Sequence, residues 1–318
     1  MEHLPVMLAE VLQQLVIKND GIYMDGTFGR GGHSKEILDR LGETGRLLAF
    51  DRDADAVNSD FAQIMCKDKR FQLKHSCFSG LESLAEAEGL LGNVDGILLD
   101  LGVSSPQLDN PERGFSFLRD GALDMRMDAH SGVSAAEWLA TVDESLLIKV
   151  LFDYGEERFA RRIARAVIEK RAETPIETTR QLAKLIEDAV PVKEKHKHPA
   201  TRSFQAIRIE INKELDELKD VLQQAAKVLK PGGRLVVISF HSLEDRIVKR
   251  FIRNESGAKF NPGKLPIKEA DIEQGLLKKI GKALKASPQE VSQNPRSRSA
   301  VLRVAERVSL ADPLSLGA

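Results

Sequence analysis

The first hundred residues alternate short apolar segments with stretches of helical periodicity, and this alternation constrains the fold more than any other feature. Strands are predicted at 22–25, 46–50, 71–74 and 94–99, and helices between them at about 34–41, 54–65 and 78–88. Strands that alternate with helices form βαβ units, which build a parallel sheet. The sequence therefore predicts an α/β fold.

The alternation stops in the middle of the chain. From about residue 106 to residue 202 there is no convincing strand pattern, and helices are predicted at 135–138 and onward, 144–152, 156–170 and 179–189. The strand pattern then resumes, with elements predicted as a long helix at 204–229, a sharp turn at 229–233, a strand at 234–240, a helix at 243–253 and a strand at 300–305. Residues 254–297 are rich in Gly, Pro and Lys and resist assignment.

This pattern predicts two domains, and a length of 318 residues agrees with that number at roughly 100–200 residues per domain. Residues 1–107 and 204–318 are expected to form a discontinuous α/β domain. Residues 108–203 are expected to form an inserted all-helical domain.

Four glycines follow the first predicted strand, in the segment DGTFGRGGH from Asp25 to His33. Glycines at such a junction let the backbone approach a ligand and adopt positive φ, and the amide groups of the following helix point towards it. The spacing matches neither the dinucleotide motif GxGxxG nor the P-loop GxxxxGK[ST]. We therefore predict a ligand-binding loop of another kind at the carboxyl edge of the sheet.

Two aspartates end later strands at the same edge. Asp51 follows the second strand, 20 residues after Gly31, where a carboxylate can accept hydrogen bonds from ribose hydroxyls. A helix N-cap is the alternative role, because a helix is predicted to begin shortly after it. Asp100 ends the fourth strand, in a polar segment DLGVSSPQ that suits a polar substrate group.

The segment LKPGGRLVV at 229–237 resembles the turn before the fifth strand of S-adenosylmethionine-dependent methyltransferases. Taken with the glycine loop and the two aspartates in their order along the chain, it makes the sequence similar to class I methyltransferases. This resemblance implies a Rossmann-like sheet.

Longer motifs narrow the resemblance to the MraW family of ribosomal RNA methyltransferases. The segments that carry it are DGTFGRGGHS at 25–34, GILLDLGVSSPQLD at 96–109, ERGFSF at 112–117, LDMRMD at 123–128, YGEERFARRIARA at 154–166, HPATRSFQAIRIEIN at 198–212, SFHSLEDRIVKRF at 239–251 and NPRSRS at 294–299. They extend over nearly the whole chain.

The resemblance implies S-adenosylmethionine as cofactor, and methylation of the exocyclic 4-amino group of one cytidine in the decoding region of small-subunit (16S) ribosomal RNA. The partner is then this RNA or the assembled small ribosomal subunit. Together with Asp25, which opens the loop, the predicted cofactor-binding residues are Gly31, Gly32, His33, Asp51, Phe78, Asp100 and Gln107.

An exocyclic amine is a poor nucleophile because its lone pair is delocalised into the ring. A hydrogen-bond acceptor on its N–H localises that lone pair and then helps to remove the proton. Asp100, Ser104 and Ser105 are the predicted catalytic residues. Many amino-methyltransferases have Asn or Asp followed by Pro-Pro-aromatic at this place, and the sequence departs from that pattern.

Charge is distributed unevenly along the chain. Residues 1–100 carry 10 basic and 17 acidic side chains, whereas the remainder carries 37 and 31. Basic side chains in this remainder are predicted to contact RNA phosphates. They are Arg158, Arg161, Arg162 and Arg165, predicted on one helix face; Lys195, Lys197 and Arg202; and Arg246, Lys249 and Arg250. There is no cluster with metal-ligand spacing, so no metal is expected.

Composition bounds the cellular context. The chain is 42% hydrophobic, its apolar runs are short, and no signal peptide is evident. Two cysteines without a CxxC motif indicate a reducing compartment, so a cytoplasmic protein without membrane association is expected. Three alternatives stay open: a non-catalytic RNA-binding assembly factor on a methyltransferase fold, an NAD-type oxidoreductase, and the same chemistry on DNA or protein.

Overall fold

The computed structural model describes residues 5–192, 198–257 and 274–309, and the chain divides into two compact units. One unit combines residues 1–102 and 215–318, and the other comprises 103–214. We expected the boundaries after residues 107 and 203. The predicted residues Lys195 and Lys197 lie outside the described residues.

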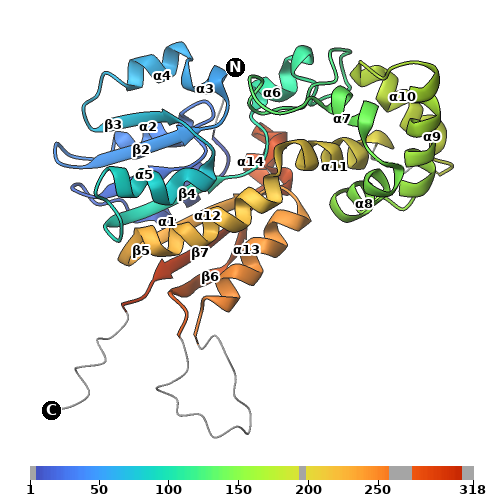
Figure 1. The fold of residues 1–318 in the computed structure, drawn as a ribbon. Coiled ribbons are helices and arrows are strands. Elements are labelled where there is room, and N and C mark those ends of the chain that lie inside the picture. Colours follow the sequence, from blue (N-terminus) through green and yellow to red (C-terminus); the bar gives the residue numbers. More distant parts are fainter. Residues whose placement is uncertain (1–4, 193–197, 258–273, 310–318) are drawn as a thin grey trace, which may run out of the picture. The chain divides into compact units, whose positions relative to one another are not determined.

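A seven-stranded sheet forms the centre of the first unit, in the order β3-β2-β1-β4-β5-β7-β6 (Figure 1). Its strands are β1 (Ile22–Asp25), β2 (Arg46–Asp51), β3 (Phe71–His75), β4 (Val94–Asp100), β5 (Leu229–Ser239), β6 (Leu277–Lys285) and β7 (Val301–Arg307). The first five are parallel, and β7 is antiparallel to both β5 and β6. This confirms the predicted α/β fold with a mainly parallel, Rossmann-like sheet.

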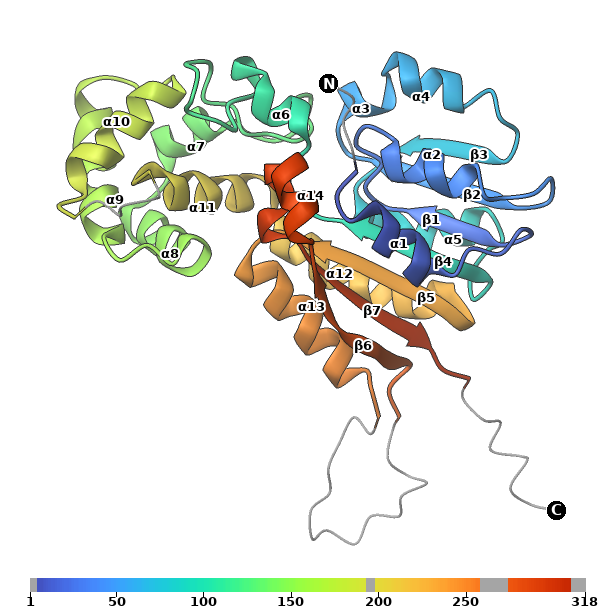
Figure 2. The same cartoon turned by 180° about the vertical axis from the view of Figure 1, so that it is seen from behind.

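Helices cover both faces of this sheet (Figures 1 and 2). They are α1 (Leu8–Leu15), α2 (Gly32–Leu38), α3 (Ala54–Val57), α4 (Asp60–Met65), α5 (Leu81–Ala87), α12 (Glu214–Val228) and α13 (Ser242–Asn254). The short helix α14 (Pro288–Gln293) has no buried residue and belongs to the connection between β6 and β7. Consecutive strand residues point to opposite faces, so Leu48 packs with α5, α12 and α13, whereas Leu47 packs with α1, α2 and α4. Both faces are buried, as parallel sheets require.

The second unit is built from helices. They are α6 (Ser105–Asp109), α7 (Ala135–Thr141), α8 (Glu144–Gly155), α9 (Ala160–Glu173), α10 (Thr179–Ala189) and α11 (Ala200–Asn212). The apolar stripes of α7 to α11 meet in one core, which includes Leu139, Leu151, Ile163, Ile186 and Phe204. Within its described residues the only strand-like pairing is an isolated bridge between Ala122 and Thr178.

Several predicted elements have different limits in the structure. The helix predicted at 54–65 is interrupted between α3 and α4, where Ser59 caps α4. The turn predicted at 229–233 lies within β5 as an irregularity of its pairing with β4. Strand β6 occupies part of the segment that resisted assignment.

The helix predicted at 156–170 begins four residues late, because Glu156 adopts left-handed φ of 49° and ends α8. Arg158 therefore lies in the connection before α9. The prediction that it shares a helix face with Arg161, Arg162 and Arg165 is wrong.

The helix predicted at 204–229 is also two helices, α11 and α12, because Lys213 adopts left-handed φ of 52°. The preceding residue explains the break. The buried side chain of Asn212 accepts a hydrogen bond from the Met127 amide (2.7 Å) and donates one to the Met125 carbonyl (2.8 Å). These bonds hold the end of α11 against the segment that contains Met125, whose own φ is 63°.

None of the helices in the described ranges combines the length and apolar character needed to cross a bilayer.

The Asn212→Ala variant is expected to destabilise the helical unit by about 2–4 kcal/mol, because a buried amide and a buried carbonyl lose their partners. Trp138, the one tryptophan of the chain, packs against the core of this unit and reports its unfolding by fluorescence in a denaturant titration.

The matched control is Lys213→Gly at the next position. Glycine relieves the left-handed backbone there, so this variant should be as stable as the wild type or slightly more so. Equal stability of Asn212→Ala and wild type would contradict the role given to Asn212.

Candidate functional site

The glycine loop connects β1 to α2, and its tight turn depends on the backbone conformation of Gly31. Gly31 has φ of 74° and immediately precedes α2. A Cβ atom at this position would lie 2.7 Å from the Phe28 ring and 2.8 Å from the Phe61 ring. Any other residue would be strained in backbone and in packing, so the tight turn needs glycine.

The carboxylate of Asp25 holds the two ends of this loop together. It accepts hydrogen bonds from the Thr27 amide (3.0 Å) and from the Ser34 hydroxyl in α2 (2.6 Å). The side chain is fully buried, and this burial raises the pKa of Asp25. Asp25 therefore stabilises the loop through hydrogen bonds to residues at both of its ends.

Asp51 connects the end of β2 to the same loop. One of its oxygens accepts a hydrogen bond from the Gly29 amide (2.7 Å), and the other accepts one from the Asp53 amide (2.8 Å). The N-cap of α3 is Asp53, whose side chain accepts from the Asp55 amide. The structure therefore assigns the helix cap to Asp53 and not to Asp51, the alternative that the sequence had left open.

The pKa of Asp51 is raised to about 6, mainly because the side chain is buried. The two amide hydrogen bonds lower this pKa, whereas the charges of Asp53 and Asp25 raise it further. A carboxylate offers about four lone-pair positions. Two remain for hydroxyl groups of a ligand.

Asp100 ends β4, next to β1 in the sheet, and its amide donates to the Thr27 hydroxyl (2.7 Å). Its Oδ2 lies 3.6 Å from Nδ1 of His33. Its Oδ1 is buried and has no hydrogen-bond partner within the described part of the chain. Burial raises the pKa of Asp100 well above its usual value, and the charges of Asp25 and Glu244 raise it further.

His33 lies in the first turn of α2 and is buried. Its Nε2 is 3.0 Å from the Val6 carbonyl, an acceptor, so Nε2 carries a proton. Burial lowers the pKa of His33, which favours the neutral ring. The Nδ1 atom that faces Asp100 then bears a lone pair, so this contact is not an ion pair at neutral pH.

Phe78 begins a short 3-10 helix (Phe78–Gly80) after β3 and is partly buried against the sheet core. The first unit thus brings Asp25, Gly31, Gly32, His33, Asp51 and Asp100 to the carboxyl ends of β1, β2 and β4. This is the edge at which open α/β sheets bind ligands.

Ser104, Ser105 and Gln107 belong to the second unit, at the start of α6. The Gln107 side chain accepts a hydrogen bond from the Ser104 amide (2.9 Å), which stabilises the first turn of this helix. Ser105 and Gln107 are buried.

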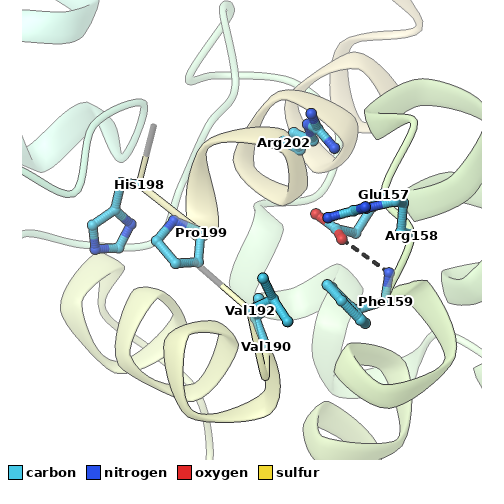
Figure 3. Close-up of a pocket in the computed structure, with 8 residues that line it drawn as sticks. All are labelled: Glu157, Arg158, Phe159, Val190, Val192, His198, Pro199 and Arg202. Atoms are coloured by element: carbon cyan, nitrogen blue, oxygen red, sulfur yellow. Dashed lines mark hydrogen bonds between the residues drawn. The ribbon is translucent and has the colours of Figure 1, made fainter. Parts of the chain in front are cut away.

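Among the predicted RNA-binding residues, Arg161, Arg162 and Arg165 are exposed on α9. Arg158 and Arg202, 44 residues apart in sequence, line one pocket of the helical unit (Figure 3). Its other lining residues are Glu157, Phe159, Val190, Val192, His198 and Pro199. The Arg158 guanidinium lies 5.5 Å from the centre of the Phe159 ring.

Arg246, Lys249 and Arg250 are exposed on α13 of the first unit. Sequence reasoning missed the lysines of β6, which lie at the edge of the same sheet. The signal available for them was a run of four lysines over eight positions without an acidic residue.

Comparison with known proteins relates nearly the whole chain to one family. A family model described as the MraW methylase family matches residues 1–308. A protein of Alteromonas mediterranea is 57% identical over 308 residues, which cover 96% of this chain and 98% of that protein. A protein of Thioalkalivibrio sulfidiphilus is 56% identical over the same shares. Both carry the name ribosomal RNA small subunit methyltransferase H.

Among solved structures, the putative rRNA methylase of Clostridium thermocellum aligns with a TM-score of 0.44 at 10% identity, over 96% of this chain and all of that one. The two relatives named above are far more similar to this chain in sequence, at 57% and 56% identity. With a family model that spans almost the entire chain and relatives more than half identical, the chain belongs to the MraW methylase family, whose members are S-adenosylmethionine-dependent methyltransferases.

Proposed function

We propose that this protein methylates the exocyclic 4-amino group of a cytidine in small-subunit ribosomal RNA. The names of its relatives support the RNA class. The observation that carries the chemistry is the buried Oδ1 of Asp100, an acceptor without a partner among the described residues at the ligand edge of the sheet.

The residues at this edge fit S-adenosylmethionine, which supplies an electrophilic methyl group on its sulfonium when bound. Asp51 retains lone pairs for ribose hydroxyls, and its two amide partners hold it in place. Phe78 offers a partly exposed aromatic surface to adenine. Gly31, Gly32 and His33, at the start of α2, line the loop that would hold the remaining polar groups.

The role proposed for Asp100 is to accept the N–H of the exocyclic amine. An acceptor there localises the amine lone pair, which makes the nitrogen more nucleophilic, and then takes the proton that the product nitrogen must lose. A raised pKa makes the carboxylate a stronger base, so the burial of Asp100 serves this role. Ser104 and Ser105 stay proposed as further contacts to the base.

The helical unit is proposed to recognise the RNA. Arginines exposed on α9 can contact phosphates, and Arg158 and Arg202 line a pocket between apolar and aromatic groups. We infer that the substrate is the assembled small subunit, because a separate helical unit with exposed arginines on α9 suits recognition of a folded RNA surface by its shape. With such a substrate, the protein is expected in the cytoplasm.

The test of this function is methyl transfer from labelled S-adenosylmethionine, offered with small subunits that lack the modification, naked ribosomal RNA, DNA and protein. Digestion of the products to nucleosides should place the label in 4-methylcytidine. Label in DNA or protein would identify another acceptor. If the protein binds the cofactor but labels no substrate, the target is a different molecule. If it neither binds the cofactor nor labels a substrate, a non-catalytic assembly factor is favoured.

Asp100→Asn is expected to lower the single-turnover rate by about 100-fold or more, since general-base catalysis contributes about 10²–10⁴-fold. Cofactor binding, measured by calorimetry, should weaken by much less. The matched control is Asp60→Asn, the same change at an exposed residue in the first turn of α4. A rate equal to that of the wild type would refute the role of Asp100.

Cofactor affinity should depend on pH through Asp51. The ionised carboxylate accepts hydroxyl hydrogen bonds, so affinity should fall about tenfold per pH unit below about 6. Because the native pKa lies above the ordinary value, the free protein should lose stability as pH rises from about 4 to about 6.

Calorimetry between pH 5 and pH 8 measures this dependence. Asp51→Asn should bind weakly, and the part of the pH dependence that belongs to Asp51 should disappear. Identical pH profiles for the variant and the wild type would show that another group controls binding.

A further inference from the structure

The most basic surface element of the first unit is β6, the edge strand of its sheet (Figure 2). Its sequence LKKIGKALK contains no acidic residue. Lys278, Lys279, Lys282 and Lys285 are all exposed. At about 3.3 Å per residue, they extend over roughly 23 Å.

These lysines are not neutralised by neighbouring acids. Within the described residues, none of the four forms an ion pair, although Lys278 faces Glu306 across the β6–β7 pair. That carboxylate is 2.9 Å from the guanidinium of Arg234 instead. On the helical unit, by contrast, Arg165 pairs with Glu169 on α9.

Helix α13 continues the basic surface. Leu277 of β6 packs in the same apolar layer as Phe251 and Ile252 of α13, so strand and helix are neighbours. Lys279 lies opposite Ala305, which also belongs to this layer, so Lys279 is on the α13 side of the sheet. The exposed basic residues of the helix, besides Arg246, are Lys249, Arg250 and Arg253.

The two acids in the first turn of α13 are already engaged. Glu244 is buried and accepts from the Phe240 amide (2.8 Å), and Asp245 pairs with Arg303 (2.7 Å). The positive charge of the strand–helix surface is therefore available to an external partner.

Lysines on an edge strand also prevent sheets from pairing with one another. That role would account for β6 alone. It does not account for the three cationic residues on the neighbouring helix, which has no open backbone edge.

We propose that β6 and α13 form a second RNA-binding surface, on the methyltransferase unit itself, that holds the phosphate backbone of the substrate RNA. This inference rests on the proposed function in taking RNA as the substrate. It assigns part of the RNA affinity to the unit that carries the methyl-transfer site.

The experiment measures the binding of the full chain to naked small-subunit ribosomal RNA over a series of salt concentrations. Each phosphate contact adds about 0.7–0.9 to the slope of log K against log salt concentration. The K278Q/K279Q/K282Q variant should therefore show a slope smaller by about 2. K249Q/R250Q/R253Q, which leaves the edge strand intact, should show a similar decrease.

The control is K67Q/K69Q/K74Q, which removes three exposed lysines from the acidic first part of the chain and should leave the slope unchanged. S-adenosylmethionine binding by every variant verifies that the fold is intact. Unchanged slopes for both test variants would overturn the inference, and self-association of the β6 variant alone would assign its lysines to edge protection. A wild-type chain that neither binds nor methylates this RNA or the assembled subunit would overturn the proposed function as well.

Discussion

Three carboxylates gathered at the ends of neighbouring strands are the constraint on which the site depends. Asp25, Asp51 and Asp100 end β1, β2 and β4, which are adjacent in the sheet. Burial of like charges is costly unless hydrogen bonds compensate it. The loop after β1 supplies that compensation, since Thr27 and Ser34 donate to Asp25 and Gly29 donates to Asp51.

This arrangement connects the stability of the loop to its function. The amides that donate to the carboxylates belong to the same glycine-rich segment that we propose approaches the ligand. Asp100 receives the least compensation, because its Oδ1 has no partner among the described residues. A ligand that donates a hydrogen bond to this oxygen would gain binding free energy, because the oxygen is already buried without a partner among the described residues. The exocyclic amine of a nucleobase is such a donor.

RNA recognition by the two units would use different physical means. The helical unit offers a pocket in which arginines lie beside an aromatic ring and apolar side chains. The sheet unit offers a row of exposed cations on β6 and α13. The first kind of surface can distinguish shapes, whereas the second adds affinity that depends on salt and little on sequence.

The sequence by itself determined the parallel part of the sheet, the glycine loop and the aspartates at the strand ends, because these depend on local alternation and on residues with special backbone freedom. It also identified the family, through long motifs along nearly the whole chain.

Only the tertiary structure decided the remaining features. The break at Lys213 follows from hydrogen bonds of Asn212 to a segment about 85 residues away, which no local pattern encodes. Strand β6 is recognisable only through its pairing with β7, because its apolar residues Leu277, Ile280 and Leu284 are spaced by three and four positions instead of two, and its register with β7 shifts between Ile280 and Leu284. The neutral state of His33, the raised pKa of Asp100 and the assignment of the helix cap to Asp53 also depend on burial and on partners that meet through the fold. Residue types and their local order thus indicated which polar groups end the strands at this edge, and packing decided their protonation and their partners.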